Sequence, residues 1–236
     1  MHPLDNPIWQ ALSTSHASFA ETRNSARKFP RDVSMLAGFS EPTPENYDSL
    51  AALLGPDERV GLFLEAPAKP PLSCTIVSSV PLLQMLCENR SFPIAEFEPN
   101  GIRSTELELI ALTQQDLPEM LDLTKLTKPG PFEARTYEMG DYLGIRIDGK
   151  LAAMAGERLR LPGYTEISAV CTHPDHLGNG YASVLMSKLM DRIFSRAELP
   201  FLHVRSENSR AVQVYERLGF TKRGSFHYVV LRKQVE

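Results

Sequence analysis

The sequence predicts a mixed α/β fold in which helices flank a twisted, mainly antiparallel sheet. Three observations lead to this prediction. Residues 142–147 and 151–159 are predicted to be two strands of a hairpin, because Asp148-Gly149 between them favours its tight turn. Residues 165–197 change from strand to helix periodicity across a glycine-rich turn. A second strand and helix follow at 201–218, which gives the alternation of elements that layered α/β proteins have.

Composition narrows the class of protein. The chain has 236 residues, of which 42% are hydrophobic and 23% charged, as in a soluble globular protein with one or two domains. The formal net charge of −4 argues against nucleic acid as the main partner. No apolar run reaches membrane-spanning length, and the N-terminus lacks the pattern of a signal peptide, so no membrane partner is predicted. Three cysteines without a CxxC pair are typical of reduced thiols in the cytoplasm.

The first half is predicted to be an α/β domain, residues 1–100, ending in a linker at 91–101. Its expected elements are a helix at 7–28, a strand at 35–39, a helix from Thr43-Pro44, strands at 60–64 and 75–79, and a short helix at 80–87. This order is compatible with a degenerate copy of the fold predicted for the second half. It contains no phosphate-binding loop, so no cofactor site is assigned to it.

The second half, residues 101–236, is predicted to carry the main sheet. Its expected elements are strands at 103–112, 142–147, 151–159, 165–172, 201–205, 221–226 and 227–232, with helices at 113–125, 181–197 and 208–218. Strict alternation along strand 165–172 places Ile167, Ala169 and Cys171 on one face and Glu166, Ser168 and Val170 on the other.

Two motifs in this half carry the functional signal. Leu177-Gly178-Asn179-Gly180-Tyr181-Ala182 forms a strand–turn–helix junction that can aim backbone N–H groups at a phosphate, although such glycines can also serve only the turn. The hexapeptide resembles the acyl-CoA pyrophosphate loop of the GCN5-related N-acetyltransferase (GNAT) superfamily, Arg/Gln-x-x-Gly-x-Gly/Ala. Asn208, Ala211, Tyr215 and Leu218-Gly219-Phe220 resemble its second motif, and the C-terminal part resembles the FR47-like branch. The resemblance covers roughly residues 106–232.

The resemblance implies an acetyl-CoA site. In that family the cofactor lies between two splayed strands, so the main chain at Val170, Cys171 and Thr172 is expected to pair with pantetheine, with the Val170 N–H facing the thioester oxygen. The hexapeptide, Asn208, Ala211 and Tyr215 complete the expected cofactor contacts. Tyr215 matches the general acid that protonates the departing sulfur; the alternative is a helix tyrosine that only packs on the core.

Three residues are candidates for the general base that removes a proton from the acceptor amine. Glu166 is predicted on the Val170 face of its strand. His203 lies where some peptide N-terminus acetyltransferases of the superfamily carry a glutamate, and an imidazole titrates near neutral pH. Glu157 is the third candidate, as a base or as a substrate contact. Each is equally compatible with a structural polar group.

Other residues receive lesser roles. Lys128 and Phe132, in a proline-rich loop, are candidate substrate contacts, with an ordinary surface turn as the alternative. Cys171, His173 and His176 lack a second ligand pair, so no metal site is predicted. Leu177 departs from the Arg or Gln of the family loop, which leaves the main chain as the expected phosphate ligand.

These features predict a cytoplasmic, acetyl-CoA-dependent N-acetyltransferase. Its acceptor is expected to be a small amine, an amino acid or a peptide N-terminus, and the protein is expected to act as a monomer or homodimer. The alternative function is a non-catalytic acyl-CoA sensor or scaffold. A further possibility gives the N-terminal half a partner-binding or dimerising role.

Overall fold

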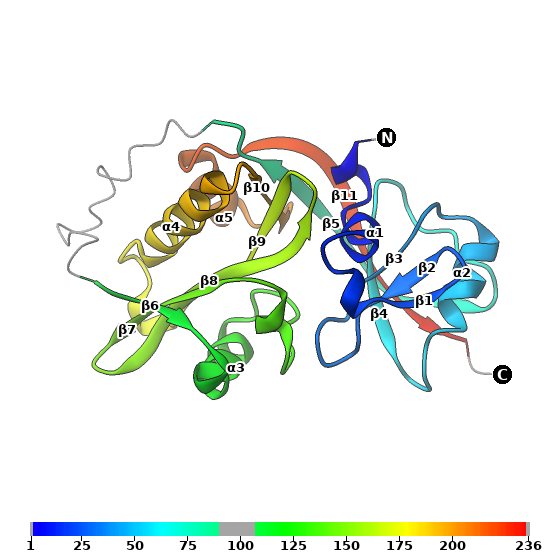
Figure 1. Ribbon diagram of the computed structural model, residues 1–236, viewed down its shortest axis with the longest axis horizontal. Helices are drawn as coiled ribbons and strands as arrows, with labels where there is room; N and C mark the ends of the chain where they lie inside the picture. The colour runs from blue at the N-terminus through cyan, green and yellow to red at the C-terminus, as the bar shows by residue number, and fades with distance from the viewer. Residues whose placement is uncertain (1, 90–106, 235–236) are drawn as a thin grey trace.

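The computed structural model describes residues 2–89 and 107–234 and contains two sheets. The larger sheet has eight strands in the order β4-β11-β5-β10-β9-β8-β7-β6, and the smaller has three in the order β1-β2-β3. Helices α4 and α5 lie on one face of the large sheet and α3 lies on the other (Figure 1). The fold is therefore the predicted mixed, mainly antiparallel α/β sheet with helices on its faces.

The element bounds follow the sequence signals closely in the second half. The helices are α1 (Pro7–Ser13), α2 (Pro44–Ala51), α3 (Leu117–Thr127), α4 (Tyr181–Ser195) and α5 (Ser209–Arg217). The strands are β1 (Glu21–Arg23), β2 (Ala26–Lys28), β3 (Ala37–Phe39), β4 (Arg59–Leu64), β5 (Cys74–Leu86), β6 (Glu108–Leu112), β7 (Tyr142–Ile147), β8 (Lys150–Leu161), β9 (Tyr164–Thr172), β10 (Leu199–Arg205) and β11 (Thr221–Lys233).

The apolar stripe of α4 explains where the main core lies. Leu185, Met186 and Leu189 are fully buried and pack on β7, β8 and β10 together with residues of α5. A second cluster, which includes Met120 of α3, covers the opposite face of the same strands. Two more clusters lie under α1 and α2, and both include residues from the C-terminal half, such as Phe201 and Val229. The part of the sheet formed by β8 and β9 is thus buried on both faces.

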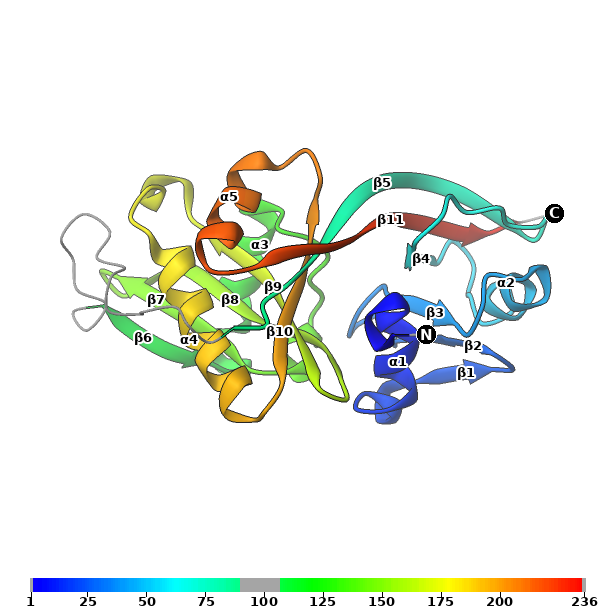
Figure 2. The same cartoon turned by 90° about the horizontal axis from the view of Figure 1, so that it is seen from above.

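Strand β5 joins the two halves of the chain. It pairs antiparallel with β10, from Phe201↔Leu86 to Arg205↔Leu82, and along its other edge with β11. Figure 2 shows β5 and β11 running side by side from the lobe of α3, α4 and α5 to the lobe of α1 and α2. The predicted linker and the boundary at residue 100 lie outside the described residues. A division into two domains stays a prediction, and so does a degenerate N-terminal copy.

Several element predictions were wrong for reasons of tertiary pairing. Residues 80–86 are strand rather than helix, because β10 and β11 hydrogen-bond to both edges of β5. The predicted 7–28 helix ends at Ser13, and 21–28 forms a hairpin whose turn contains Asn24 at a φ of 49°. The two strands predicted at 221–232 are one long strand, which keeps its pairing with β5 through two register shifts.

Candidate active site

The site begins where two parallel strands separate. Strands β9 and β10 pair only from Leu199↔Tyr164 to Phe201↔Glu166. Both strands continue, β9 to Thr172 and β10 to Arg205, but β10 turns to pair with β5 instead. The edge of β9 that faces β10 is therefore left without a strand partner after Glu166. We refer to the paired part of β9 as its closed end and to residues 169–172 as its open end.

A bulge shapes the open end. Ala169 has a φ of 53°, and the pairing with β8 shifts register between Gly156↔Ser168 and Met154↔Cys171. One extra residue in β9 reverses the side-chain alternation. Ile167 and Val170 consequently pack toward α4 and α5, whereas Cys171 packs toward α3. The predicted shared face of Ile167 and Cys171 was wrong, and so was the shared face of Glu166 and Val170.

A cavity of about 850 Å³ lies between the open end, the glycine-rich turn and α5. We call it the loop cavity. It is lined by every predicted cofactor residue except Asn179, namely Val170, Cys171, Thr172, Leu177, Gly178, Gly180, Tyr181, Ala182, Asn208, Ala211 and Tyr215. The Asn179 amide donates to the carbonyl oxygen of His176 instead, at 3.2 Å. The glycine-rich turn and the motif that begins at Asn208 thus meet at one cavity, although they lie far apart in the sequence.

The start of α4 lies at the loop cavity. Gly178 and Gly180 have φ values of 86° and 70°, a region that glycine enters without steric cost. The first helical bond runs from the Val184 N–H to the Gly180 carbonyl, so the N–H groups of the preceding turn have no acceptor within the helix. They lie at the positive end of the helix dipole, which favours a phosphate.

Sequence reasoning missed two cations in this cavity. Arg210 and Arg217 of α5 line it, are exposed, and form no ion pair with any described residue. The helical spacing of seven residues, 217 − 210, was visible in the sequence and puts both side chains on one face of α5. Leu177, where the family loop has Arg or Gln, is 52% exposed. The two arginines supply positive charge that Leu177 does not.

A second cavity, of about 380 Å³, opens on the other side of the strand separation. We call it the wedge cavity. Its walls come from both halves of the chain: Phe63, Val80 and Leu82 from β4 and β5, residues 127–131 after α3, and Tyr228 from β11. Val170, Asn208, Ala211 and Tyr215 line both cavities. The two cavities therefore meet at the open end of β9.

Tyr215 lies at this meeting point. It extends from α5, and its ring packs edge-on against Phe220 with the ring centroids 6.2 Å apart. Burial raises the pKa of its hydroxyl to about 12. The phenol therefore stays protonated at neutral pH and can act as a hydrogen-bond and proton donor to a group held at the junction.

Glu166 lies at the closed end and is fully buried. Arg158 donates two hydrogen bonds to its carboxylate, from Nε and Nη2, each at 2.8 Å. Burial raises the pKa of Glu166, but the charge of Arg158 and the bond from His203 outweigh it and lower the pKa to about 2. A carboxylate with that pKa and no access to either cavity has little capacity to take a proton from an amine.

His203 connects this pair to the N-terminal half. Its Nδ1 lies 2.7 Å from Glu166 Oε1, and its Nε2 lies 3.1 Å from Gln84 Nε2. Because Gln84 Oε1 accepts a bond from Arg223, the amide nitrogen of Gln84 faces His203 as a donor. His203 Nε2 is then the acceptor, and Nδ1 carries the proton that is donated to Glu166. Burial lowers the pKa of His203, so the ring is neutral and both nitrogens are already bonded.

The remaining predicted residues lie at different distances from the cavities. Lys128 ends α3 in the left-handed backbone conformation, and it lines the wedge cavity. Phe132 packs edge-on against Tyr142 at 5.6 Å and lines neither cavity. Glu157 forms an ion pair with Arg196, the residue that follows α4, at 2.7 Å. It also lies outside both cavities. Burial raises the pKa of Glu157.

Cys171 is a buried thiol. Burial raises the pKa of Cys171 to about 11, which keeps the thiol protonated and weakly nucleophilic. Residues 2–89 and 107–234 contain no group of three or more His, Cys, Asp or Glu side chains arranged to hold a metal ion. In the same residues no helix is both long and apolar enough to cross a membrane.

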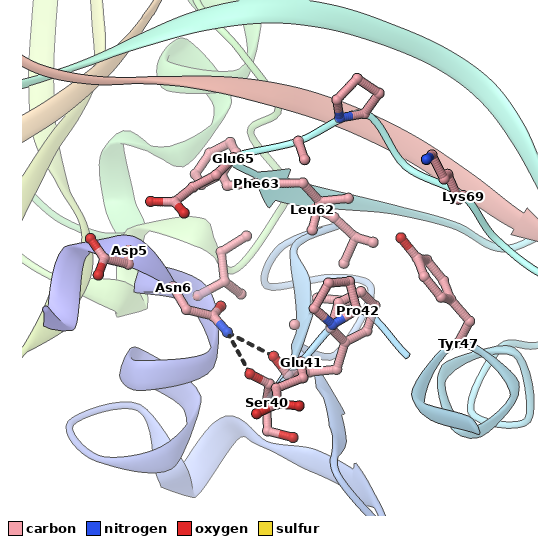
Figure 3. Close-up of a pocket in the computed structure, with 17 residues that line it drawn as sticks. Asp5, Asn6, Ser40, Glu41, Pro42, Tyr47, Leu62, Phe63, Glu65 and Lys69 are labelled. Atoms are coloured by element: carbon pink, nitrogen blue, oxygen red, sulfur yellow. Dashed lines mark hydrogen bonds between the residues drawn. The ribbon is translucent and has the colours of Figure 1, made fainter. Parts of the chain in front are cut away.

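A third cavity, of about 380 Å³, lies in the N-terminal half between α1, β3 and β4 (Figure 3). The Asn6 amide closes one side by donating to the carbonyl oxygens of Phe39 and Ser40. The carboxylates of Asp5, Glu41 and Glu65 line this cavity, as does Lys69. No residue of the two motifs reaches it. The candidate active site is therefore the junction of the loop and wedge cavities.

Known proteins share both the motif region and the whole fold. Residues 142–230 match the FR47-like protein family. The crystal structure of a protein from Novosphingobium aromaticivorans, assigned as an acetyltransferase of the GNAT family, is 34% identical over 100% of both chains, with a TM-score of 0.88. The chain belongs to the GNAT superfamily. This match covers the N-terminal half too. The arrangement of β4, β5 and β11 is therefore part of the fold that the two proteins share.

Two curated N-acetyltransferases match part of this GNAT protein. The [ribosomal protein bS18]-alanine N-acetyltransferase of Escherichia coli is 27% identical over 118 residues, which are 48% of this chain and 79% of that protein. N-alpha-acetyltransferase RimI of Mycobacterium tuberculosis is 34% identical over 86 residues. The latter match covers 35% of this chain and about half of the relative, 53%. These relatives are named as N-acetyltransferases.

Proposed function

We propose that this GNAT protein transfers an acetyl group from acetyl-CoA to a primary amine. The observation that carries the proposal is the meeting of the two cavities at Val170 and Tyr215. The loop cavity suits the phosphates of CoA, because it combines the positive N-terminal end of α4 with Arg210 and Arg217. The cofactor supplies the acetyl thioester. The wedge cavity receives the amine from the opposite side.

Each residue at the junction then has a defined task. The bulge at Ala169 turns the backbone of Val170 toward the separated strands, where an N–H group can stabilise an oxyanion. Tyr215 donates a proton to the sulfur that leaves. Glu166 and His203, which are bonded to Arg158 and Gln84, hold the closed end of the strands together instead of acting as bases. The amine loses its proton to solvent in the open cavity before it attacks.

The N-acetyltransferase relatives support acetyl as the transferred group and an amine as the acceptor. We further propose that the protein acts in the cytoplasm, where its free cysteines stay reduced. Either a monomer or a homodimer can carry the site, since each residue named above belongs to one chain.

Thiol release from acetyl-CoA in the presence of a panel of amines, amino acids and short peptides tests the function. Release that depends on the amine, together with a mass increase of one acetyl group in the product, is the expected result. Calorimetry of CoA binding should accompany the assay. Binding of CoA without thiol release for any acceptor would contradict the enzyme and favour the alternative, an acyl-CoA sensor.

A further inference from the structure

We propose that the acceptor is a free amino acid, or another small amine that carries a carboxylate next to its amino group. This inference rests on the proposed function and concerns the wedge cavity. It separates three acceptor classes that the sequence left open: small amines without an acid group, amino acids, and peptide N-termini.

The charged residues of the wedge cavity are of one sign. Lys128, Arg158 and Arg205 line it, and within the described part of the chain no aspartate or glutamate does. This is unexpected in a chain with a net charge of −4. The third cavity, of similar size, is lined by three carboxylates and a single lysine, so an all-cationic lining is not a general property of this protein's surface.

Arg158 provides a donor at the inner wall. Arg158 as a whole residue is 8% exposed, and its guanidinium lies 5.6 Å from the centre of the Phe63 ring and uses Nε and Nη2 to bind Glu166. Its third nitrogen, Nη1, has no hydrogen-bond partner within residues 2–89 and 107–234. Nη1 is not among the sealed, unpartnered polar atoms of the described residues, and Arg158 lines the wedge cavity, so a carboxylate in the cavity can accept its hydrogen bond.

Lys128 and Arg205 provide charge at the rim. Lys128 is exposed and forms no ion pair with a described residue. Arg205 is 64% exposed, and its contact with Glu207 is 3.7 Å long, a weak surface pair. Neither residue lines the loop cavity, where Arg210 and Arg217 face the phosphate site instead. The rim cations are therefore free to bind the acceptor.

The same charges act on the acceptor's amino group. A cationic cavity disfavours a second positive charge, so it lowers the pKa of an ammonium group that enters it. This favours the neutral amine that attacks the thioester, and it compensates for the lack of a free base at Glu166 and His203. A polyamine, which carries several positive charges and no carboxylate, would be repelled. A peptide N-terminus has no carboxylate adjacent to its amine.

Matched acceptor pairs test this inference. Alanine and alaninamide, and phenylalanine and phenylalaninamide, differ in the carboxylate alone, and spermidine represents the polyamines. After correction for the fraction of neutral amine, we expect kcat/KM to be about tenfold or more higher for each acid than for its amide. Equal rates for acid and amide, or faster acetylation of spermidine, would overturn the carboxylate requirement while leaving acetyl transfer intact.

Two rim variants sharpen the test. Lys128→Asn keeps a residue that tolerates the left-handed conformation, and Arg205→Gln removes the other exposed cation. Each should raise KM for the acids several-fold, leave kcat nearly unchanged, and have little effect on the amides. Lys125→Gln, on the same helix as Lys128 but outside both cavities, is the control for charge loss. An equal change for acid and amide would contradict the proposal.

A binding measurement separates this inference from the proposed function. N-acetylalanine and N-acetylalaninamide represent the two products, and calorimetry on the CoA-loaded protein needs no turnover. Tighter binding of the acid, lost in the rim variants, supports the carboxylate site even if no thiol is released. Equal binding of the two products would overturn it, whatever the outcome of the thiol assay.

Discussion

The two ends of β9 differ in what their polar groups do. At the closed end, Arg158, Glu166 and His203 are buried, bonded to one another and tied to Gln84 of the N-terminal half. At the open end no neighbouring strand pairs with β9 on the side of β10, and the Tyr215 side chain lies between the two cavities. From the sequence alone, Glu166 and His203 of the closed end are candidate catalytic bases because their side chains titrate. The backbone and one phenol of the open end are better placed for chemistry.

The difference has a simple physical origin. A buried carboxylate is tolerated when its charge is paired, and Glu166, which accepts two hydrogen bonds from Arg158, keeps little capacity for proton transfer. A reactive site instead needs unpaired donors beside open space. If the closed end is structural and the open end catalytic, substitutions at the two ends should change different measured quantities.

The largest expected effect is on stability, from Glu166→Gln. The variant leaves Arg158 charged, buried and without its carboxylate partner, so the free energy of unfolding should fall by about 3–5 kcal/mol. Urea denaturation at neutral pH measures it. Glu138→Gln, which breaks an exposed pair with Arg135, is the matched control and should cost about 1 kcal/mol or less. Similar losses in both variants would contradict the structural role.

The same carboxylate predicts a pH dependence. Because its pKa falls from 4.5 in the unfolded chain to about 2 in the fold, its contribution to stability is complete above pH 4.5 and is lost as the pH falls toward 2. Denaturation curves of the parent should show this loss, and those of Glu166→Gln should not. The pH profile of kcat/KM of the folded variant should keep its acidic limb, which it would lose if Glu166 were the base.

A smaller effect is expected at the open end, on turnover, from Tyr215→Phe. Loss of the proton donor should lower kcat by about ten- to a thousandfold and leave CoA affinity nearly unchanged. Since the pKa of Tyr215 is about 12, the parent should show no loss of kcat from this group below about pH 10. Tyr164→Phe, at the closed end, serves as the control. Unchanged turnover in Tyr215→Phe would refute the acid assignment.

The next effect concerns cofactor affinity, through Gly180→Val. Valine at a φ of 70° strains the turn by about 1–2 kcal/mol and places a branched side chain in the phosphate site, so CoA should bind about ten- to a hundredfold more weakly. Gly178→Ala is the control, because a Cβ there meets no atom within 4 Å and only the strain remains. Calorimetry with CoA decides. Unimpaired binding by Gly180→Val would remove the loop cavity as the phosphate site.

The smallest effect is expected from Leu177→Arg, which restores the residue type of the family loop. A third cation beside Arg210 and Arg217 should tighten CoA binding a few-fold, and added salt should reduce the gain because it is electrostatic. Leu72→Arg adds the same charge at an exposed position of the N-terminal half and should change nothing. A salt-independent gain would point to packing rather than charge.

The site could be predicted from the sequence where its signal is local. Gly178 and Gly180 allow the positive φ values of the turn, and Asn208 caps α5 by accepting the Ala211 N–H, as its residue type favours. The roles of Glu166 and His203 were not predictable in the same way. Their partners, Arg158 and Gln84, lie 8 and 119 residues away, and neither spacing marks an ion pair or a hydrogen bond.

The same distinction holds for the fold. Local patterns determined the hairpin at Asp148-Gly149, the apolar stripe of α4 and the glycine turn, because turn geometry and side-chain periodicity depend on neighbouring residues. Only the tertiary structure decided that residues 80–86 form a strand, since β10 and β11 supply hydrogen bonds that override the helix-like spacing of their leucines. The bulge at Ala169 likewise depends on the pairing with β8, and it reverses which side chains of β9 pack toward α3 and which pack toward α4 and α5.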